Sequence, residues 1–450
     1  MTRGSAVRRN RAHRSRGWWA CAVLVAFVTT GCGPMWTMYH FDLGHSGADT
    51  TAPDIVPVAR AWTSTALDGL IYGQPLVYND RVYVATENDW VYALDIGSGA
   101  IVWSKQIGVP VRSTEVPCPL NVDPLGITGT AVIDTATNTI FFVAELTAPV
   151  RHELVGLDVS DGSEKVRVSG DPTGVDPIMD HQRPALALAN GRVYWAYGGA
   201  DCGQYHGKVV SVKTDGTSPL VYTVPSINRG SIWAPSGPAI DADGNVWVAT
   251  GDGTSTTTYD HTTSVIKLSP TLDELGYFAP RGWATLNQRG TEIGSTGPLL
   301  LPGGYVFQMG KNGIAYILRQ SNPGGIGGNV TSLSLSCNAT GGNATSPGMV
   351  YVECLSGIRA LTLDTTGSTP KLQLAWTGPG DANGSPVFGG NTVWVVAVST
   401  GLLYALNPAD GSVRQSINIG HARNFTSPTI ANDTVIVATD YHVQAFRHAP

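Results

Sequence analysis

Three features of the 450-residue chain predict an all-β fold made of repeated four-stranded units. Charged residues make up 14% of the chain, well below the ~25% of ordinary soluble domains, while hydrophobic residues make up 42%. The 54 glycines and 28 prolines divide the apolar sequence into short runs, which is typical of strands joined by tight turns. The third feature is an internal repeat with units 39 to 60 residues apart.

The first clear unit spans residues 73–103 and contains four short apolar runs separated by turn residues. Four strands in a meander form one blade of a β-propeller. The start of the unit recurs eight times as a small or polar residue followed by proline, which suits the first residue of a strand. Thr130 replaces proline in one of the copies, which are Gln74-Pro75, Gly129-Thr130, Arg183-Pro184, Gly237-Pro238, Gly297-Pro298, Ser346-Pro347, Ser385-Pro386 and Ser427-Pro428.

The ends of the chain complete this pattern. The last copy, residues 427–446, has only three strands, and the run at residues 58–63 supplies the fourth. Pairing of the N- and C-terminal strands closes the ring and leaves no exposed sheet edge at the seam. We therefore expect an eight-bladed β-propeller of four-stranded antiparallel blades over residues 57–450, preceded by a tether and lead-in at 32–56.

Residues 1–31 have the features of an export signal. Six arginines and no acid precede a 13-residue, largely apolar run, which is too short to span a membrane. Cys32 follows a small residue, as in the lipidation site of bacterial lipoproteins, although Thr29 stands where that motif usually has an aliphatic residue. We expect a protein lipid-anchored on the extracytoplasmic side; free secretion and a retained helix remain alternatives.

Charge and cysteine content agree with export. Without residues 1–31 the chain has 22 basic and 34 acidic residues, a net charge of −12, which argues against nucleic-acid binding. Four cysteines remain after Cys32, an even set that suggests two disulfides in an oxidising compartment. Connections between blades share one face of a propeller with the loops between second and third strands, so we expect the pairs Cys118–Cys202 and Cys337–Cys354.

The segment Ala93–Trp103 resembles the A-L-D-x-x-T-G-x-x-x-W signature of the pyrroloquinoline-quinone-like (PQQ-like) β-propeller repeat. Weaker matches cover most of residues 57–450. The resemblance implies two functional classes. One is the quinoprotein dehydrogenases, which bind PQQ and calcium in the propeller axis beside a disulfide between adjacent cysteines. The other is non-enzymatic scaffolds, such as the lipoprotein propeller of outer-membrane protein assembly. No two cysteines adjoin in this chain, and the calcium ligands of the dehydrogenases find no matching motif.

Candidate site residues follow from the expected blade starts. Arg183 precedes the proline of an inner strand, which places its five donors near the central channel, where they could clamp a carboxylate. Gln74 holds the equivalent place in the first blade. Alternatively, Arg183 pairs with a carboxylate of a neighbouring blade, Asp252 or Glu292. These four residues are the candidate ligand-binding set, with neither a catalytic residue nor a metal ligand predicted.

Shape and charge together favour a non-enzymatic binding protein. Its propeller face and axial funnel would bind a protein, a polymer or a small ligand outside the cytoplasm. The alternative is an oxidoreductase that uses PQQ or another cofactor in the funnel. A glycan-active enzyme is a third hypothesis, which rests on fold analogy alone.

Overall fold

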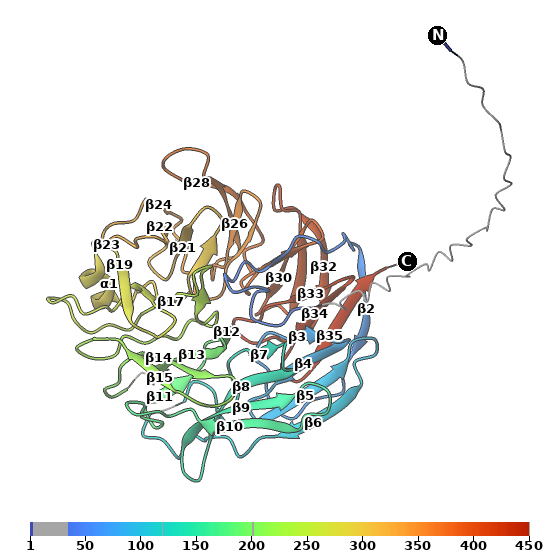
Figure 1. Cartoon of the computed structure of the whole chain (residues 1–450), viewed down its shortest axis with the longest axis horizontal. Coiled ribbons are helices and arrows are strands. Elements are labelled where there is room, and N and C mark those ends of the chain that lie inside the picture. The colour runs from blue at the N-terminus through green and yellow to red at the C-terminus, as the bar shows by residue number, and fades with distance from the viewer. Residues whose placement is uncertain (3–34, 119, 200–201, 450) are drawn as a thin grey trace. The chain divides into compact units, whose positions relative to one another are not determined.

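The computed structural model describes residues 1–2, 35–118, 120–199 and 202–449, so the expected signal segment and Cys32 lie outside the described residues. The chain divides into two units, Met1–Cys32 and Gly33–Pro450, and the strands considered below belong to the second. Within that unit, eight sheets follow one another around a central axis (Figure 1). The fold is an eight-bladed all-β propeller, as the sequence predicts.

The first four blades run from the N-terminal side of the ring. Blade 1 contains β3 (Leu76–Tyr78), β4 (Arg81–Ala85), β5 (Trp90–Asp95) and β6 (Ile101–Gln106). Blade 2 contains β7 (Val132–Asp134), β8 (Thr139–Leu146), β9 (Arg151–Asp158) and β10 (Glu164–Ser169). Blade 3 contains β11 (Asp180–Gln182), β12 (Ala187–Ala189), β13 (Arg192–Gly199), β14 (Lys208–Lys213) and β15 (Leu220–Thr223). Blade 4 contains β16 (Ala239–Ile240), β17 (Val246–Ala249), β18 (Val265–Leu268), β19 (Glu274–Ala279) and β23 (Gly325–Ile326).

The other four blades complete the ring. A short helix, α1 (Trp283–Arg289), precedes blade 5, which contains β20 (Leu299–Leu301), β21 (Tyr305–Gln308), β22 (Ile314–Arg319) and β24 (Thr331–Ser334). Blade 6 contains β25 (Ala344–Ser346), β26 (Met349–Val352), β27 (Arg359–Asp364) and β28 (Lys371–Thr377). Blade 7 contains β29 (Val387–Gly389), β30 (Thr392–Ala397), β31 (Leu402–Leu406), β32 (Val413–Asn418) and β1 (Ala48–Asp49). Blade 8 contains β33 (Thr429–Ala431), β34 (Thr434–Ala438), β35 (Val443–His448) and β2 (Val58–Thr63).

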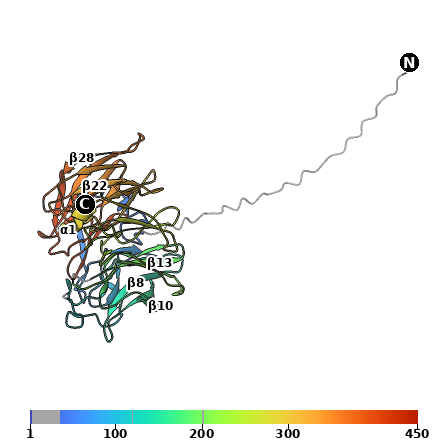
Figure 2. The ribbon, with the colours of Figure 1, turned by 90° about the vertical axis from the view of Figure 1, so that its left-hand side faces the viewer.

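The seam between the two ends of the propeller is the predicted one. Strand β2 pairs antiparallel with β35, with Val58 opposite His448 and Thr63 opposite Gln444. In blade 6 the structure differs from the expectation, because β25 ends at Ser346 and Pro347-Gly348 forms the turn to β26. Proline there occupies the first turn position, where its fixed φ is favourable, rather than the start of the inner strand. In the side view, β28 of blade 6 lies on the opposite side of the unit from β8 and β10 of blade 2 (Figure 2).

Tryptophans on three outer strands fix neighbouring blades to each other. Each indole N–H donates to a backbone carbonyl in the turn between the third and fourth strands of the next blade. The bonds run from Trp62 to Ile96 at 2.9 Å, from Trp103 to Val159 at 3.1 Å and from Trp376 to Pro408 at 2.9 Å. The rings lie against glycines at which a Cβ would approach to 2.7 Å or less, Gly99, Gly162 and Gly411. These contacts explain why the repeat signature requires both its glycine and its tryptophan.

The lead-in crosses the central channel. Between Trp36 and Gly47 its backbone exchanges hydrogen bonds of 2.7 to 2.9 Å with the inner strands of six blades, through Val77, Ile133, Ile240, Leu300, Thr345 and Phe388. Strand β1 then adds in parallel to β29 of blade 7. A segment that bonds to inner strands all around the ring must fill the channel between them. Residues 36–49 therefore belong to the propeller body and close the channel at the level of the inner strands.

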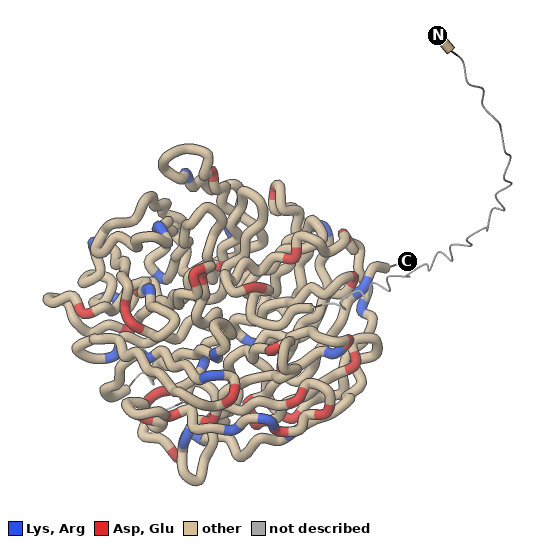
Figure 3. Tube along the Cα trace, viewed as in Figure 1, with Lys and Arg blue, Asp and Glu red and all other residues tan. Residues whose placement is uncertain are grey.

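Charged side chains of both signs are scattered over the blades along the described chain (Figure 3). The described part contains no helix long and apolar enough to cross a membrane.

Candidate functional site

His40 holds the lead-in at the centre of the channel. Its side chain is fully buried, and burial lowers its pKa to about 3, so the imidazole is neutral. Nδ1 donates to the carbonyl of Asn343 at 2.9 Å, and Nε2 accepts from the hydroxyl of Ser427 at 3.0 Å. The backbone N–H of His40 donates to Gln74 Oε1 at 2.9 Å. These bonds join the lead-in to blades 1, 6 and 8.

A cavity of about 480 Å³ lies at the other end of the channel, which we call the open end. Its walls come from the connections between blades and from the loops between second and third strands, two sets of loops that share one face. The side chains used below are Tyr72, His181, Arg183, Trp233, Lys311 and Phe425. A void of about 10 Å³ beneath it is lined by Arg183 and by Tyr39 of the lead-in, so the lead-in forms the floor of the funnel.

Arg183 reaches this cavity because the inner strand of blade 3 is interrupted. Strands β11 and β12 both pair with β13, and residues 183–186 separate them. The Arg183 guanidinium lies 4.2 Å from the ring centre of Phe425 and 5.2 Å from that of Trp233. Burial lowers its pKa to about 10. Among the described residues Arg183 forms no ion pair, and its guanidinium is held between two aromatic rings.

Lys311 brings a second cation to Trp233. Its Nζ lies 5.0 Å from the centre of that ring and 2.5 Å from Glu292 Oε1. Glu292 is 1% exposed and pairs with Lys311 rather than with Arg183. The indole N–H of Trp233 is buried and has no hydrogen-bond partner in the described part of the chain. The open end therefore brings two cations, Arg183 and Lys311, to the same aromatic ring.

The remaining candidates separate into two places. Asp252 lines the cavity and has a positive φ of 51°. Gln74 lies away from the cavity, 4% exposed, where it accepts from His40 and donates to the Pro428 carbonyl at 2.6 Å. The structure thus brings Arg183 and Asp252 together at the open end, while Gln74 holds the lead-in and Glu292 holds Lys311.

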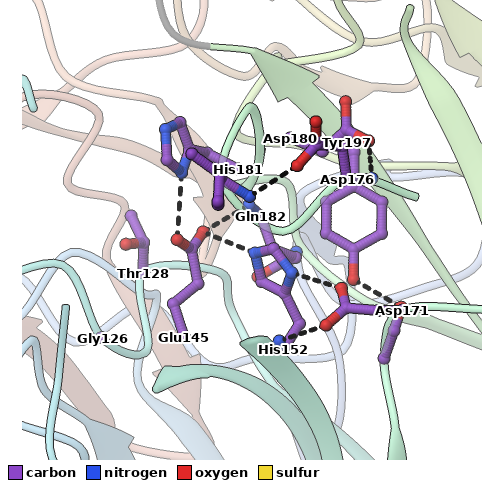
Figure 4. Close-up of polar contacts among 12 residues, drawn as sticks. Gly126, Thr128, Glu145, His152, Asp171, Asp176, Asp180, His181, Gln182 and Tyr197 are labelled. Carbon is purple, nitrogen blue, oxygen red and sulfur yellow. Dashed lines mark hydrogen bonds and ion pairs between the residues drawn. The ribbon is translucent and has the colours of Figure 1, made fainter. Parts of the chain in front are cut away.

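His181, which lines the cavity, belongs to a buried network of polar side chains (Figure 4). Glu145, 1% exposed, accepts from the Gln182 backbone at 2.6 Å and contacts His181 Nδ1 at 3.1 Å and His152 Nε2 at 3.3 Å. Burial alone would raise the pKa of Glu145, but the two histidines outweigh it and lower the pKa to about 2. Burial alone would lower the pKa of His152, but Glu145 and Asp171 raise it to about 10.

Sequence reasoning missed several cavity residues, and one signal could have found three of them. Tyr72, His181 and Phe425 each stand three residues before the recurring proline of an inner strand, at Pro75, Pro184 and Pro428. In these three copies the residue precedes the inner strand and lines the cavity. Trp233 and Lys311 carry no comparable signal, because they lie in a connection between blades and in a loop between second and third strands, outside the recurring proline motif.

Both disulfides join the pairs of cysteines expected from the propeller geometry. Cys118 bonds to Cys202 and Cys337 bonds to Cys354, each with a Cα–Cα distance of 5.7 Å. The first disulfide flanks the cavity, because Leu120–Val122 of the same connection line it.

A second hollow, of about 570 Å³, lies over the lead-in. The carboxylate of its acidic residue, Asp42, already accepts hydrogen bonds from Ser46 and Gly44.

Comparisons with known proteins agree with this architecture. The family model described as outer membrane protein assembly factor BamB matches residues 59–264. No curated protein matches the sequence.

Among solved structures, the quinohemoprotein alcohol dehydrogenase of Comamonas testosteroni aligns with a TM-score of 0.71 at 14% identity, covering 92% of this chain and 80% of that one. A europium-containing methanol dehydrogenase gives 0.68 at 12% identity, with 92% and 98% covered. BamB of Moraxella catarrhalis gives 0.58 at 15% identity, with 87% and 97% covered. The repeat signature, the eight blades and these matches agree that the chain has the fold of the PQQ-like β-propellers.

Proposed function

We propose that this chain is an exported, non-enzymatic binding protein whose open end holds a ligand, or a segment of a partner, through an anionic group. One observation carries the proposal: Arg183 lies at the cavity, with its charge unpaired among the described residues. A guanidinium presents five donors in a planar fork that matches a carboxylate.

The energetic cost of the Arg183 charge argues for a binding role. Arg183 is partly buried, and a cation held away from water without a counterion lowers stability. The aromatic rings of Trp233 and Phe425 offset part of that cost and hold the guanidinium in place. Lys311 adds positive potential beside it, although Glu292 neutralises much of that charge. Ligand binding supplies the missing anion.

Export completes the proposal. Two disulfides suit an oxidising compartment. We further propose that residues 1–31 are removed and that Cys32 carries a lipid, which would hold the propeller at the extracytoplasmic surface of a membrane. The BamB likeness supports a protein partner as one kind of occupant.

The alternative is an oxidoreductase with a cofactor in the same funnel, supported by the fold of the dehydrogenase neighbours. Arg183, Lys311 and Trp233 suit an anionic planar group. The residues do not fit the metal half of such a site, because the described part of the chain has no group of three His, Cys, Asp or Glu side chains placed to hold a metal ion. The disulfides also join distant cysteines, 84 and 17 residues apart.

Native mass spectrometry of the full chain, purified from its own exported fraction, tests the proposal. We expect an anionic compound that stays bound to the native protein, leaves on denaturation and is absent from Arg183→Met. Arg112→Met, an exposed arginine, is the matched control and should retain the compound. Retention by Arg183→Met would contradict the proposal. Calorimetric titration with PQQ, with and without Ca²⁺, tests the alternative, which stoichiometric binding would favour.

A further inference from the structure

We propose that the ligand of the open-end cavity is an acidic sugar, such as a uronate unit, with its carboxylate on Arg183 and a hydroxyl on His181. This inference rests on the proposed binding function and adds the chemical class of the ligand. It combines two groups that the proposed function leaves unexplained, the imidazole of His181 and the indole N–H of Trp233.

His181 is prepared to accept a hydrogen bond. Its Nδ1 lies 3.1 Å from Glu145 Oε2, and a carboxylate can only accept, so Nδ1 carries a proton. In the neutral imidazole, Nε2 then carries a lone pair. That nitrogen is buried, has no partner among the described residues, and belongs to a side chain that lines the cavity. In Figure 4 the ring has one nitrogen on Glu145 and the other turned away from it.

The position of His181 is rigidly held. The same carboxylate that orients the ring accepts the backbone N–H of Gln182 at 2.6 Å, and its other contact is His152. His152 is in turn bonded through Nδ1 to Asp171 at 2.6 Å. An acceptor that is fixed on both sides in this way loses little freedom when it binds a ligand, so it selects for a donor at one place.

Arg183 and His181 act on the same ligand. His181 lies in β11, Arg183 follows directly after that strand, and both side chains line the cavity. Trp233, whose Nε1 is buried without a hydrogen-bond partner among the described residues, also lines the cavity. The cavity thus presents donors for an anion next to an acceptor for a hydroxyl.

A plain carboxylate matches only half of this arrangement. A fatty acid, a benzoate or another anion without a hydroxyl would leave His181 Nε2 buried and unpaired, which weakens binding by about tenfold or more. A neutral sugar would leave the guanidinium unpaired. The cavity volume of about 480 Å³ exceeds what a small hydroxy acid fills and lies in the range of ordinary ligand pockets. A sugar acid satisfies all three conditions.

Calorimetric titration of the full chain with D-glucuronate, D-glucose and benzoate tests this inference. We expect glucuronate to bind, benzoate to bind about tenfold or more weakly, and glucose to show no measurable binding. His181→Leu should remove the preference for glucuronate over benzoate, while His181→Gln, which keeps an acceptor, should restore part of it. Equal thermal unfolding midpoints of the variants would show that folding is not the cause.

The outcomes separate the two proposals. If benzoate binds as tightly as glucuronate, or if His181→Leu keeps the preference, the acidic-sugar class is wrong while the anion-binding function stands. If none of the three compounds binds, the class is again wrong, and the native mass spectrum decides the function. If glucuronate binds equally to wild type and to Arg183→Met, both proposals are wrong.

Discussion

The two ends of the axial channel are built in different ways. At the closed end, the lead-in is held by backbone hydrogen bonds to the inner strands of six blades, and the imidazole of His40 has a partner for each nitrogen. At the open end, side chains from separate loops meet around a cavity, and Arg183, Trp233 Nε1 and His181 Nε2 lack partners among the described residues.

This difference indicates which residues stabilise the fold and which residues bind a ligand. Backbone bonds to every part of a ring stabilise the fold and depend little on which side chains are present. Buried polar atoms without partners occur at both ends, Trp36 Nε1 and His45 Nδ1 among them, but at the open end a cation without an ion-pair partner among the described residues lines a cavity. Such a charge costs stability and is retained where it acts on something else. We therefore expect changes at the closed end to lower the free energy of unfolding, and changes at the open end to alter binding with little loss of stability.

The largest effect is expected for Trp36→Ala at the closed end. Trp36 is fully buried and pairs through its backbone with Val77. Its ring packs against that of Phe41, with 5.1 Å between the ring centres. Loss of so large a buried side chain should lower the free energy of unfolding by about 3–5 kcal/mol. Urea unfolding measures it, with the neighbouring, exposed Met35→Ala as control. Equal stabilities of the two variants would show that the lead-in is not part of the core.

The two disulfides allow the region beside the cavity to be compared with another region of the same propeller face. Replacement of Cys118 and Cys202 by serine opens a loop of 84 residues, and replacement of Cys337 and Cys354 a loop of 17. Each pair should cost about 2–4 kcal/mol, with the longer loop costing about 1 kcal/mol more. Only the first pair flanks the cavity, so only its loss should weaken ligand binding. Comparable binding losses for both pairs would contradict the placement of the site.

A pH-dependent gain is expected for Asp89→Asn. Asp89 is fully buried, and neither carboxylate oxygen has a hydrogen-bond partner in the described chain. Burial, with Glu87 and Glu145 nearby, raises its pKa from 3.8 to about 9. The folded state therefore keeps a proton that the unfolded state releases above pH 4, and stability falls as pH rises between about 4 and 9.

Asparagine removes that titration without changing the shape. The variant should be more stable than wild type at pH 8, and its advantage should shrink towards pH 4 by up to about 1.4 kcal/mol per pH unit. Urea unfolding at pH 5 and pH 8 measures the difference. The exposed Asp243→Asn is the control. A pH-independent difference would mean that the Asp89 carboxyl ionises normally in the folded protein.

The fold could be predicted from the sequence because the repeat is a packing requirement. The glycine and tryptophan of the signature are in contact across blades, as at Gly162 and Trp103, so they recur wherever two blades meet in that way. Closure through residues 58–63 followed from a missing strand. Ser346-Pro347 misled, because proline suits a turn as well as a strand start.

The site was harder to predict because its residues depart from the repeat. Arg183 could be predicted to lie near the channel because the proline of an inner strand follows it. Trp233 and Lys311 lie outside the recurring proline motif, in a connection between blades and in a loop between second and third strands, and only the folded chain brings them together. The hydrogen bond from the His40 backbone to Gln74 could not be foreseen either, because a lead-in has no repeat partner to reveal its path.

Urea unfolding of Arg183→Met tests the central claim most directly, because it needs no knowledge of the ligand. If Arg183 is held for binding, its replacement by methionine removes a partly buried cation that forms no ion pair among the described residues, and keeps apolar contact with Trp233 and Phe425. The account predicts a free energy of unfolding equal to or above that of wild type. A loss of more than about 1 kcal/mol would show that Arg183 stabilises the fold, and would contradict its assignment to a binding site.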